Sequence, residues 1–171
     1  MQQSVKVVAV LAANPALSSI LSAVLAASPA LRVRQFESVA ALTTYMRLAP
    51  IDLLVCDFDC EAAPAGSLAA GLRGDRALSR TRLQIIALAS QLNPDVKRAS
   101  LEGGIDEIIV KPMSPRYLLE RVIARLRRGD VRASGRPRAP ASSQERLVAA
   151  AAAAAAYRQR GDNVIPLFGD R

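Results

Sequence analysis

The sequence predicts an α/β fold in which helices cover both faces of a parallel β-sheet. Apolar runs typical of strands alternate five times with segments that have helical periodicity. The runs at residues 5–11 and 83–88 contain almost no charge, as expected for strands that are buried on both faces. Asn-Pro and Ser-Pro pairs precede several of the helical segments. Strands and helices that alternate in this way favour a parallel sheet.

The first half of the chain predicts three strands and three helices. Strands are expected at residues 5–11, 31–36 and 52–58. Asn14 is a good N-cap, and Pro15 suits the first turn of a helix that ends near residue 28. Its apolar side, expected to face the sheet, includes Ile20. Ser38 caps a second helix that continues through residue 48, and residues 66–72 predict a weaker third helix.

The second half continues the alternation with strands at residues 83–88 and 105–110. Asn93 and Pro94 begin a fourth helix, which should extend to about residue 101 because two glycines follow soon afterwards. Ser114 and Pro115 begin the last helix, which is expected to end near residue 127. We therefore predict a single domain at residues 1–128.

Composition narrows the functional classes. The 171 residues are 51% hydrophobic, which argues against a wholly disordered chain. No run of about 18 apolar residues is present, so we expect no membrane span. The net charge is +8, but no recognition helix-turn-helix is evident, so nucleic-acid binding is not expected. Cys56 and Cys60 occur in a chain without histidine, which favours free thiols in a reducing cytoplasm over a zinc site.

The composition changes after residue 128. Residues 129–141 are rich in Gly, Pro, Arg and Ser and predict a flexible basic linker. Residues 142–161 contain an unbroken alanine run and predict a helix with few large side chains to bury. Residues 162–171 form an apolar tail, which we expect to be disordered or folded back on the domain. A docking peptide is the alternative interpretation of this tail.

Three stretches carry a family resemblance. Asp57 ends the apolar run 51–57, Ala89 lies at the end of the run 83–90, and Lys111-Pro112 closes the run 104–112. In order and spacing they resemble the receiver domain of bacterial two-component response regulators, from residue 5 to about residue 127. The resemblance implies a flavodoxin-like, doubly wound sheet of five parallel strands in the order 2-1-3-4-5. In such a sheet, ligands bind at the carboxyl ends of the strands.

The resemblance also implies roles for individual residues. Asp57 matches the aspartate that accepts a phosphoryl group from a partner histidine, a reaction in which a carboxylate serves as the nucleophile. Lys111 matches the lysine that neutralises phosphoryl charge, and a Mg²⁺ ion normally assists. The implied partner is a sensor histidine kinase or a phosphotransfer protein.

The chain departs from the family pattern at four residues. Ala12 and Ala13 replace the acidic pair that helps to hold Mg²⁺. Ala89 stands where the family has a hydroxyl, although Ser90 follows and is a candidate substitute for contacting a phosphoryl oxygen. Ile108 replaces the aromatic residue that reorients on activation.

The remaining acids could rebuild the metal site from the other side of the pocket. That candidate metal set is Asp57, Asp59 and Glu61. Loss of the acidic pair at Ala12 and Ala13 should weaken Mg²⁺ binding sharply, so Mg²⁺ is a possible but doubtful cofactor.

These departures favour a stand-alone, atypical receiver-like protein that is not an enzyme and acts by protein–protein contact. The contact face implied by the family consists of the fourth helix, the fifth strand and the fifth helix. Near it lies a basic set: Arg116, Arg121, Arg125, Arg127 and Arg128.

Two alternatives remain open. One is a working phosphorelay receiver that is phosphorylated on Asp57 with an unconventional metal site. The other is a module that binds a small anion such as a cyclic dinucleotide, because arginine suits phosphate. Its candidate residues are Arg73, Arg76, Arg80 and Arg82.

Overall fold

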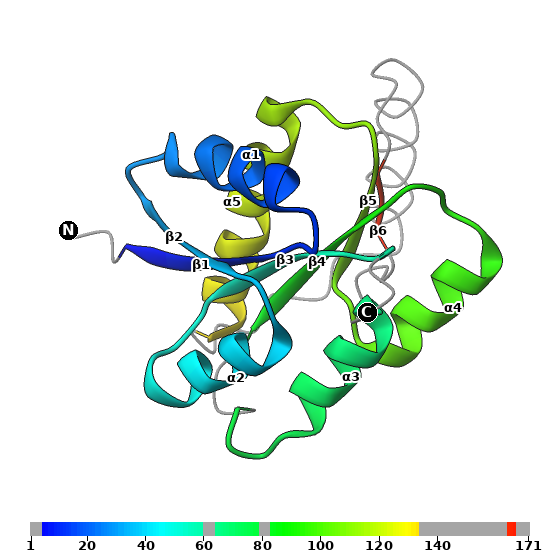
Figure 1. Ribbon diagram of the computed structural model, residues 1–171, viewed down its shortest axis with the longest axis horizontal. Coiled ribbons are helices and arrows are strands. Elements are labelled where there is room, and N and C mark those ends of the chain that lie inside the picture. The colour runs from blue at the N-terminus through cyan, green and yellow to red at the C-terminus, as the bar shows by residue number, and fades with distance from the viewer. Residues whose placement is uncertain (1–4, 60–63, 79–82, 134–163, 167–171) are drawn as a thin grey trace, which may run out of the picture.

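The computed structural model describes residues 5–59, 64–78, 83–133 and 164–166 (Figure 1). Within them, strands and helices alternate as the sequence predicts. The strands are β1 (Lys6–Leu11), β2 (Leu31–Phe36), β3 (Leu53–Asp57), β4 (Gln84–Ala89), β5 (Glu107–Val110) and β6 (Val164–Pro166). The helices are α1 (Pro15–Ala26), α2 (Val39–Leu48), α3 (Ala65–Gly74), α4 (Pro94–Gly103) and α5 (Pro115–Ala133).

The strands form one sheet in the order β2-β1-β3-β4-β5-β6. The first five strands are parallel, so the predicted fold class and the order 2-1-3-4-5 are confirmed. The sixth strand was not predicted. It pairs antiparallel with β5 at the edge of the sheet.

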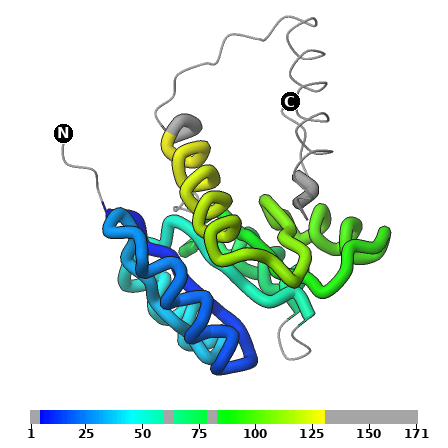
Figure 2. The backbone as a smooth tube through the Cα atoms, turned by 90° about the horizontal axis from the view of Figure 1, so that it is seen from above, coloured from blue at the N-terminus to red at the C-terminus, as the bar shows by residue number. Residues whose placement is uncertain are grey.

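Helices cover both faces of the sheet (Figure 1). Side chains of α1 and α5, including Leu25 and Val122, pack on one face, onto which Figure 2 looks. Side chains of α2 and α3, including Leu42 and Ala69, pack on the other face, with Val96 of α4 against them. Every residue of β4 is buried, which explains why its sequence is apolar from Ile85 to Ala89 after the polar Gln84.

Local capping signals were predicted correctly. The side chains of Asn14, Ser38 and Asn93 each accept hydrogen bonds from backbone N–H groups in the first turn of α1, α2 and α4. Gly104 ends α4 with φ of 74°, a left-handed conformation that glycine adopts without steric cost.

Helices α3 and α4 approach each other closely at two glycines. A Cβ atom on Gly103 would lie 2.4 Å from the carbonyl oxygen of Gly66. A Cβ atom on Gly66 would lie 3.0 Å from the carbonyl oxygen of Ala99. The absence of side chains at both positions therefore sets the spacing of the two helices.

Two expectations are corrected. Helix α5 continues to Ala133, so it includes the first residues of the segment we had assigned to the linker. Ile20 is 59% exposed and does not face the sheet as expected. Val24, on the same predicted stripe, is only partly buried.

The rest of the linker, the Ala-rich segment 142–161 and most of the tail lie outside the described residues. Among the helices that the structure describes, none is long and apolar enough to cross a membrane.

Candidate functional site

The predicted site residues lie at the carboxyl edge of the sheet. Asp57 is the last residue of β3, Ser90 follows β4, and Lys111 follows β5. The backbone fixes this edge, because Phe58 N–H donates to the Leu88 carbonyl and Lys111 N–H donates to the Ala89 carbonyl. Parallel pairing of β3, β4 and β5 therefore brings together side chains that are distant in the sequence.

Lys111 links two carboxylates. Its Nζ lies 2.9 Å from Oδ1 of Asp57 and 3.1 Å from Oδ2 of Asp59. Burial alone would lower the pKa of Lys111, but hydrogen bonds to Asp57 and Asp59 outweigh that effect and raise it. The ammonium is therefore firmly protonated at neutral pH, and it stabilises both carboxylates.

Asp59 folds back across the edge of the sheet. Its backbone N–H donates to Oδ1 of Asp57 over 3.2 Å, and its own Oδ2 accepts from both the N–H and the hydroxyl of Ser90, each at 2.7 Å. Burial tends to raise the pKa of Asp59, but the bonds from Ser90 and Lys111 lower it below its usual value. The donors of Ser90 and Lys111 therefore already contact a carboxylate anion.

At the end of β1, the described residues Ala12 and Ala13 provide no carboxylate. Leu11 pairs with Cys56, which places Ala12 beside Asp57 in the register of the sheet. Ala12 is buried and Ala13 is exposed, and neither has an oxygen in its side chain for a cation.

The oxygen donors of the described residues at this edge do not complete a site for Mg²⁺, which prefers octahedral oxygen ligands. Among the residues that the structure describes, no group of three or more His, Cys, Asp or Glu could hold a metal ion. Asp57 and Asp59 are already bonded to Lys111, and Glu61 lies outside the described residues.

Ala89 and Ile108, two of the residues that depart from the family pattern, lie in the core. Ala89 is fully buried at the end of β4, and Ile108 is 1% exposed, in the same core cluster. Ile108 therefore fills volume in the core between the sheet and the helices on that face.

Arg73, the first residue of the predicted anion-binding cluster, has a structural role. The guanidinium of Arg73 donates to the carbonyls of Leu83 and Gly104 and to the carboxylate of Asp106. These bonds tie α3 to the start of β4 and to the loop before β5. Arg80 and Arg82 lie outside the described residues.

A buried ion cluster was missed from the sequence. Glu107, which is fully buried at the start of β5, accepts hydrogen bonds from Arg121 and Arg125 of α5. Arg125 also donates to the carbonyl of Asp106. The sequence contained one signal for this cluster: Arg121 and Arg125 are four residues apart, so they lie on the same face of a helix. Two arginines of the basic set, Arg121 and Arg125, therefore form ion pairs within the domain.

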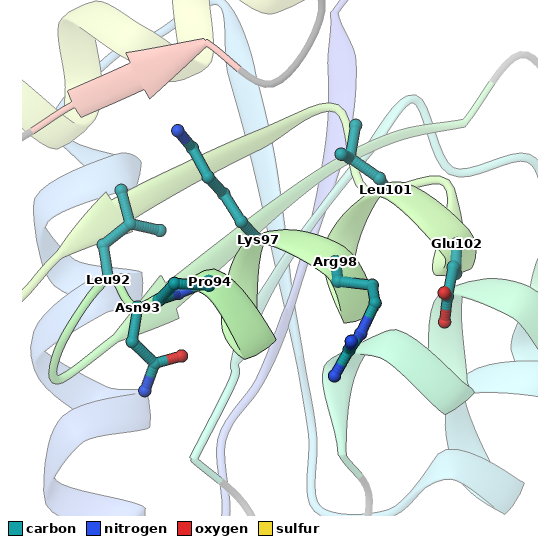
Figure 3. Close-up of a pocket in the computed structure, with 7 residues that line it drawn as sticks. All are labelled: Leu92, Asn93, Pro94, Lys97, Arg98, Leu101 and Glu102. Carbon is teal, nitrogen blue, oxygen red and sulfur yellow. The ribbon is translucent and has the colours of Figure 1, made fainter.

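A hollow of about 790 Å³ lies along α4. Its lining residues are Leu92, Asn93, Pro94, Lys97, Arg98, Leu101 and Glu102. Figure 3 shows Leu92, Lys97 and Leu101 extending to one side of the helix, while Arg98 and Glu102 extend to the other. Leu101 is 45% exposed, so this side of α4 presents apolar surface beside positive charge.

Comparisons with known proteins identify the fold. No model of a known protein family matches the sequence, and no curated protein shows significant sequence similarity to it. Solved receiver domains do match the structure. A CheY-like receiver domain protein from Methanospirillum hungatei matches with a TM-score of 0.65 and 18% identity, over 75% of this chain and 99% of that one.

Other solved receivers match similarly. A putative response regulator from Chloroflexus aurantiacus matches with a TM-score of 0.63 and 22% identity, over 71% of this chain and 98% of that one. The chemotaxis protein CheY4 of Vibrio cholerae matches with a TM-score of 0.63 and 16% identity, over 72% and 99%. The chain therefore has the receiver-domain fold of response regulators.

Proposed function

We propose that this chain is a receiver-like signalling protein of the cytoplasm that acts by protein–protein contact and does not depend on phosphorylation of Asp57. It is a signalling module, not an enzyme. The partner class is a sensor histidine kinase, a phosphotransfer protein or another component of a two-component pathway.

One observation carries this proposal. The Asp59 carboxylate accepts from both donors of Ser90 and contacts the ammonium of Lys111. A phosphoryl group on Asp57 would need positive charge and hydrogen-bond donors around its oxygens. Here the nearby donors are already satisfied by a carboxylate, and alanines stand where metal-binding acids would be. The edge of the sheet therefore offers an incoming phosphoryl group few free hydrogen-bond donors and little uncompensated positive charge.

The proposed contact surface consists of the outer sides of α4 and α5 with the edge of β5, which β6 covers in this structure. The hollow along α4 offers apolar surface at Leu92 and Leu101 and a positive charge at Lys97. On α5, Arg127 and Arg128 are exposed. A partner with an apolar anchor and flanking acidic residues would complement this surface.

The direct test is intact-mass spectrometry after incubation with a small phosphodonor, with and without Mg²⁺. Wild type and Asp57→Ala are compared, and a conventional receiver in the same tubes shows that the phosphodonor is active. We expect no phosphate mass increment on the folded wild-type protein. A Mg²⁺-dependent increment that Asp57→Ala loses would overturn the proposal.

That opposite result would establish a second candidate function, a phosphorelay receiver with a rebuilt metal site. The observation that favours it is the contact of 2.9 Å between Lys111 Nζ and Oδ1 of Asp57, which keeps a positive charge at the candidate nucleophile. Glu61→Gln would then distinguish the source of the metal ligands. The increment should fall in that variant if Glu61 completes the set with Asp57 and Asp59.

A further inference from the structure

The outer edge of β5 carries an extra strand. Val164–Pro166 runs antiparallel to β5, with Ile165 opposite Ile108 and Val164 opposite Ile109 (Figure 1, β6 in red). Without this strand, β5 would be the last strand of the parallel sheet, with unpaired backbone N–H and C=O groups. The C-terminal segment therefore covers an edge to which another strand could otherwise be added.

The geometry of β5 leaves its backbone as the available binding surface. Ile108 is buried in the core on the side of α2 and α3, and Ile109 is buried in the core on the side of α1 and α5. The hydrogen bonds that Arg121 and Arg125 donate to Glu107 hold α5 against the strand. A ligand at this edge must therefore bind chiefly through main-chain hydrogen bonds, as in β-strand addition.

The hydrogen-bond pattern identifies the central pair. Lys111 N–H donates to the Ala89 carbonyl of β4. Because backbone groups of alternate strand residues point the same way, those of Ile109 also face β4 and those of Ile108 face outwards. Ile165 lies opposite Ile108. The pairing of the added strand with β5 should therefore depend most on the backbone N–H of Ile165.

The added strand is short and ends in a proline. Val and Ile are strong strand formers, whereas proline lacks an N–H and is confined to edge positions. This strand has three residues, which is at the short end of the range for strands in sheets, so its contact with β5 is weak. Both features suit a segment that binds reversibly and does not itself recruit a further strand.

We propose that the edge of β5 is a strand-addition site and that this chain's own segment Val164–Pro166 is its occupant within the same molecule. The site takes an extended, β-branched segment antiparallel to β5. Any partner that adds a strand there must first displace this segment, so its apparent affinity is its intrinsic affinity multiplied by the fraction of molecules in which the edge is uncovered. Only this last consequence rests on the proposed function.

The experiment uses the full-length chain and Ile165→Pro, which removes the critical N–H. Ile165→Ala retains that N–H and is the matched control. Hydrogen exchange measured by mass spectrometry should be several-fold faster at β5 in Ile165→Pro than in wild type, with Ile165→Ala closer to wild type. Equal exchange at β5 in all three proteins would overturn the proposal.

A second readout tests competition with a labelled synthetic peptide of residues 160–171. The peptide should bind Ile165→Pro about tenfold or more tightly than wild type, because its site is uncovered. Equal binding to both proteins, or binding to neither, would overturn the proposal. A wild-type dimer in light scattering that Ile165→Pro converts to a monomer would overturn the assignment to the same molecule.

The two readouts involve only this chain and its own peptide. A chain that ends at residue 163 provides the same comparison if Ile165→Pro does not fold. Since neither measurement uses a phosphodonor, a partner or Mg²⁺, their outcome is independent of whether Asp57 is phosphorylated.

Discussion

Breaking the ion cluster between β5 and α5 should cost more unfolding free energy than breaking an exposed ion pair such as that of Arg116 and Glu120. Glu107 is fully buried, and the side chain of Arg125 is 8% exposed. Removing one partner of a buried pair leaves an uncompensated charge and costs about 3–5 kcal/mol. Glu107→Ala removes the carboxylate that Arg121 and Arg125 both bind and leaves the charge of the buried Arg125 without its carboxylate, so we expect a loss of unfolding free energy in this range. That is a large share of the roughly 5–15 kcal/mol typical of a domain.

Glu120→Ala is the matched control, because Glu120 pairs with Arg116 on the same helix with both side chains largely exposed. It should cost about 0.5 kcal/mol or less. Urea unfolding followed by far-ultraviolet circular dichroism suits a protein without tryptophan. Glu107→Gln, which keeps the shape and removes the charge, provides a value if Glu107→Ala does not fold.

Salt provides an independent check on the same variants. High salt screens exposed charges and should abolish the effect of Glu120→Ala while leaving that of Glu107→Ala nearly unchanged. A loss below about 1 kcal/mol for Glu107→Ala, or one equal to that of Glu120→Ala, would refute the reasoning from burial.

Two further predictions concern helix spacing and pH. Gly103→Ala should destabilise the protein by about 1–3 kcal/mol, because the new Cβ atom would lie 2.4 Å from the Gly66 carbonyl oxygen. Gly71→Ala is the control and should stabilise slightly, because a Cβ atom at that position would have no atom within 4 Å. Equal urea midpoints for the two variants would contradict this reasoning. The lowered pKa of Asp59 implies stabilisation that is present above its unfolded pKa of about 4 and lost as the pH falls through the lower folded value. Asp59→Asn should therefore be less stable than wild type by about 0.2–1 kcal/mol at pH 7, with the difference vanishing near pH 2; a pH-independent difference would assign the effect to packing.

Short-range signals in the sequence were sufficient for the order of the first five strands and the five helices, and for the starts of α1, α2 and α4. Asn14, Ser38 and Asn93 cap helices through bonds to residues two or three positions away. Periodicity and capping act within a few residues, so the sequence displays them directly. They also placed Asp57 and Lys111 at the ends of strands, and the parallel sheet then brought these two side chains together.

Contacts between distant elements followed only from packing. The sequence showed Asp59 as a loop acid and Ser90 as a loop hydroxyl, and the pairing of β3 with β4 joins them. Likewise, nothing local shows that Glu107 is buried, or that Val164–Pro166 pairs with β5. Such contacts depend on which backbone edges and faces remain free once the core has formed, and that is a property of the whole chain.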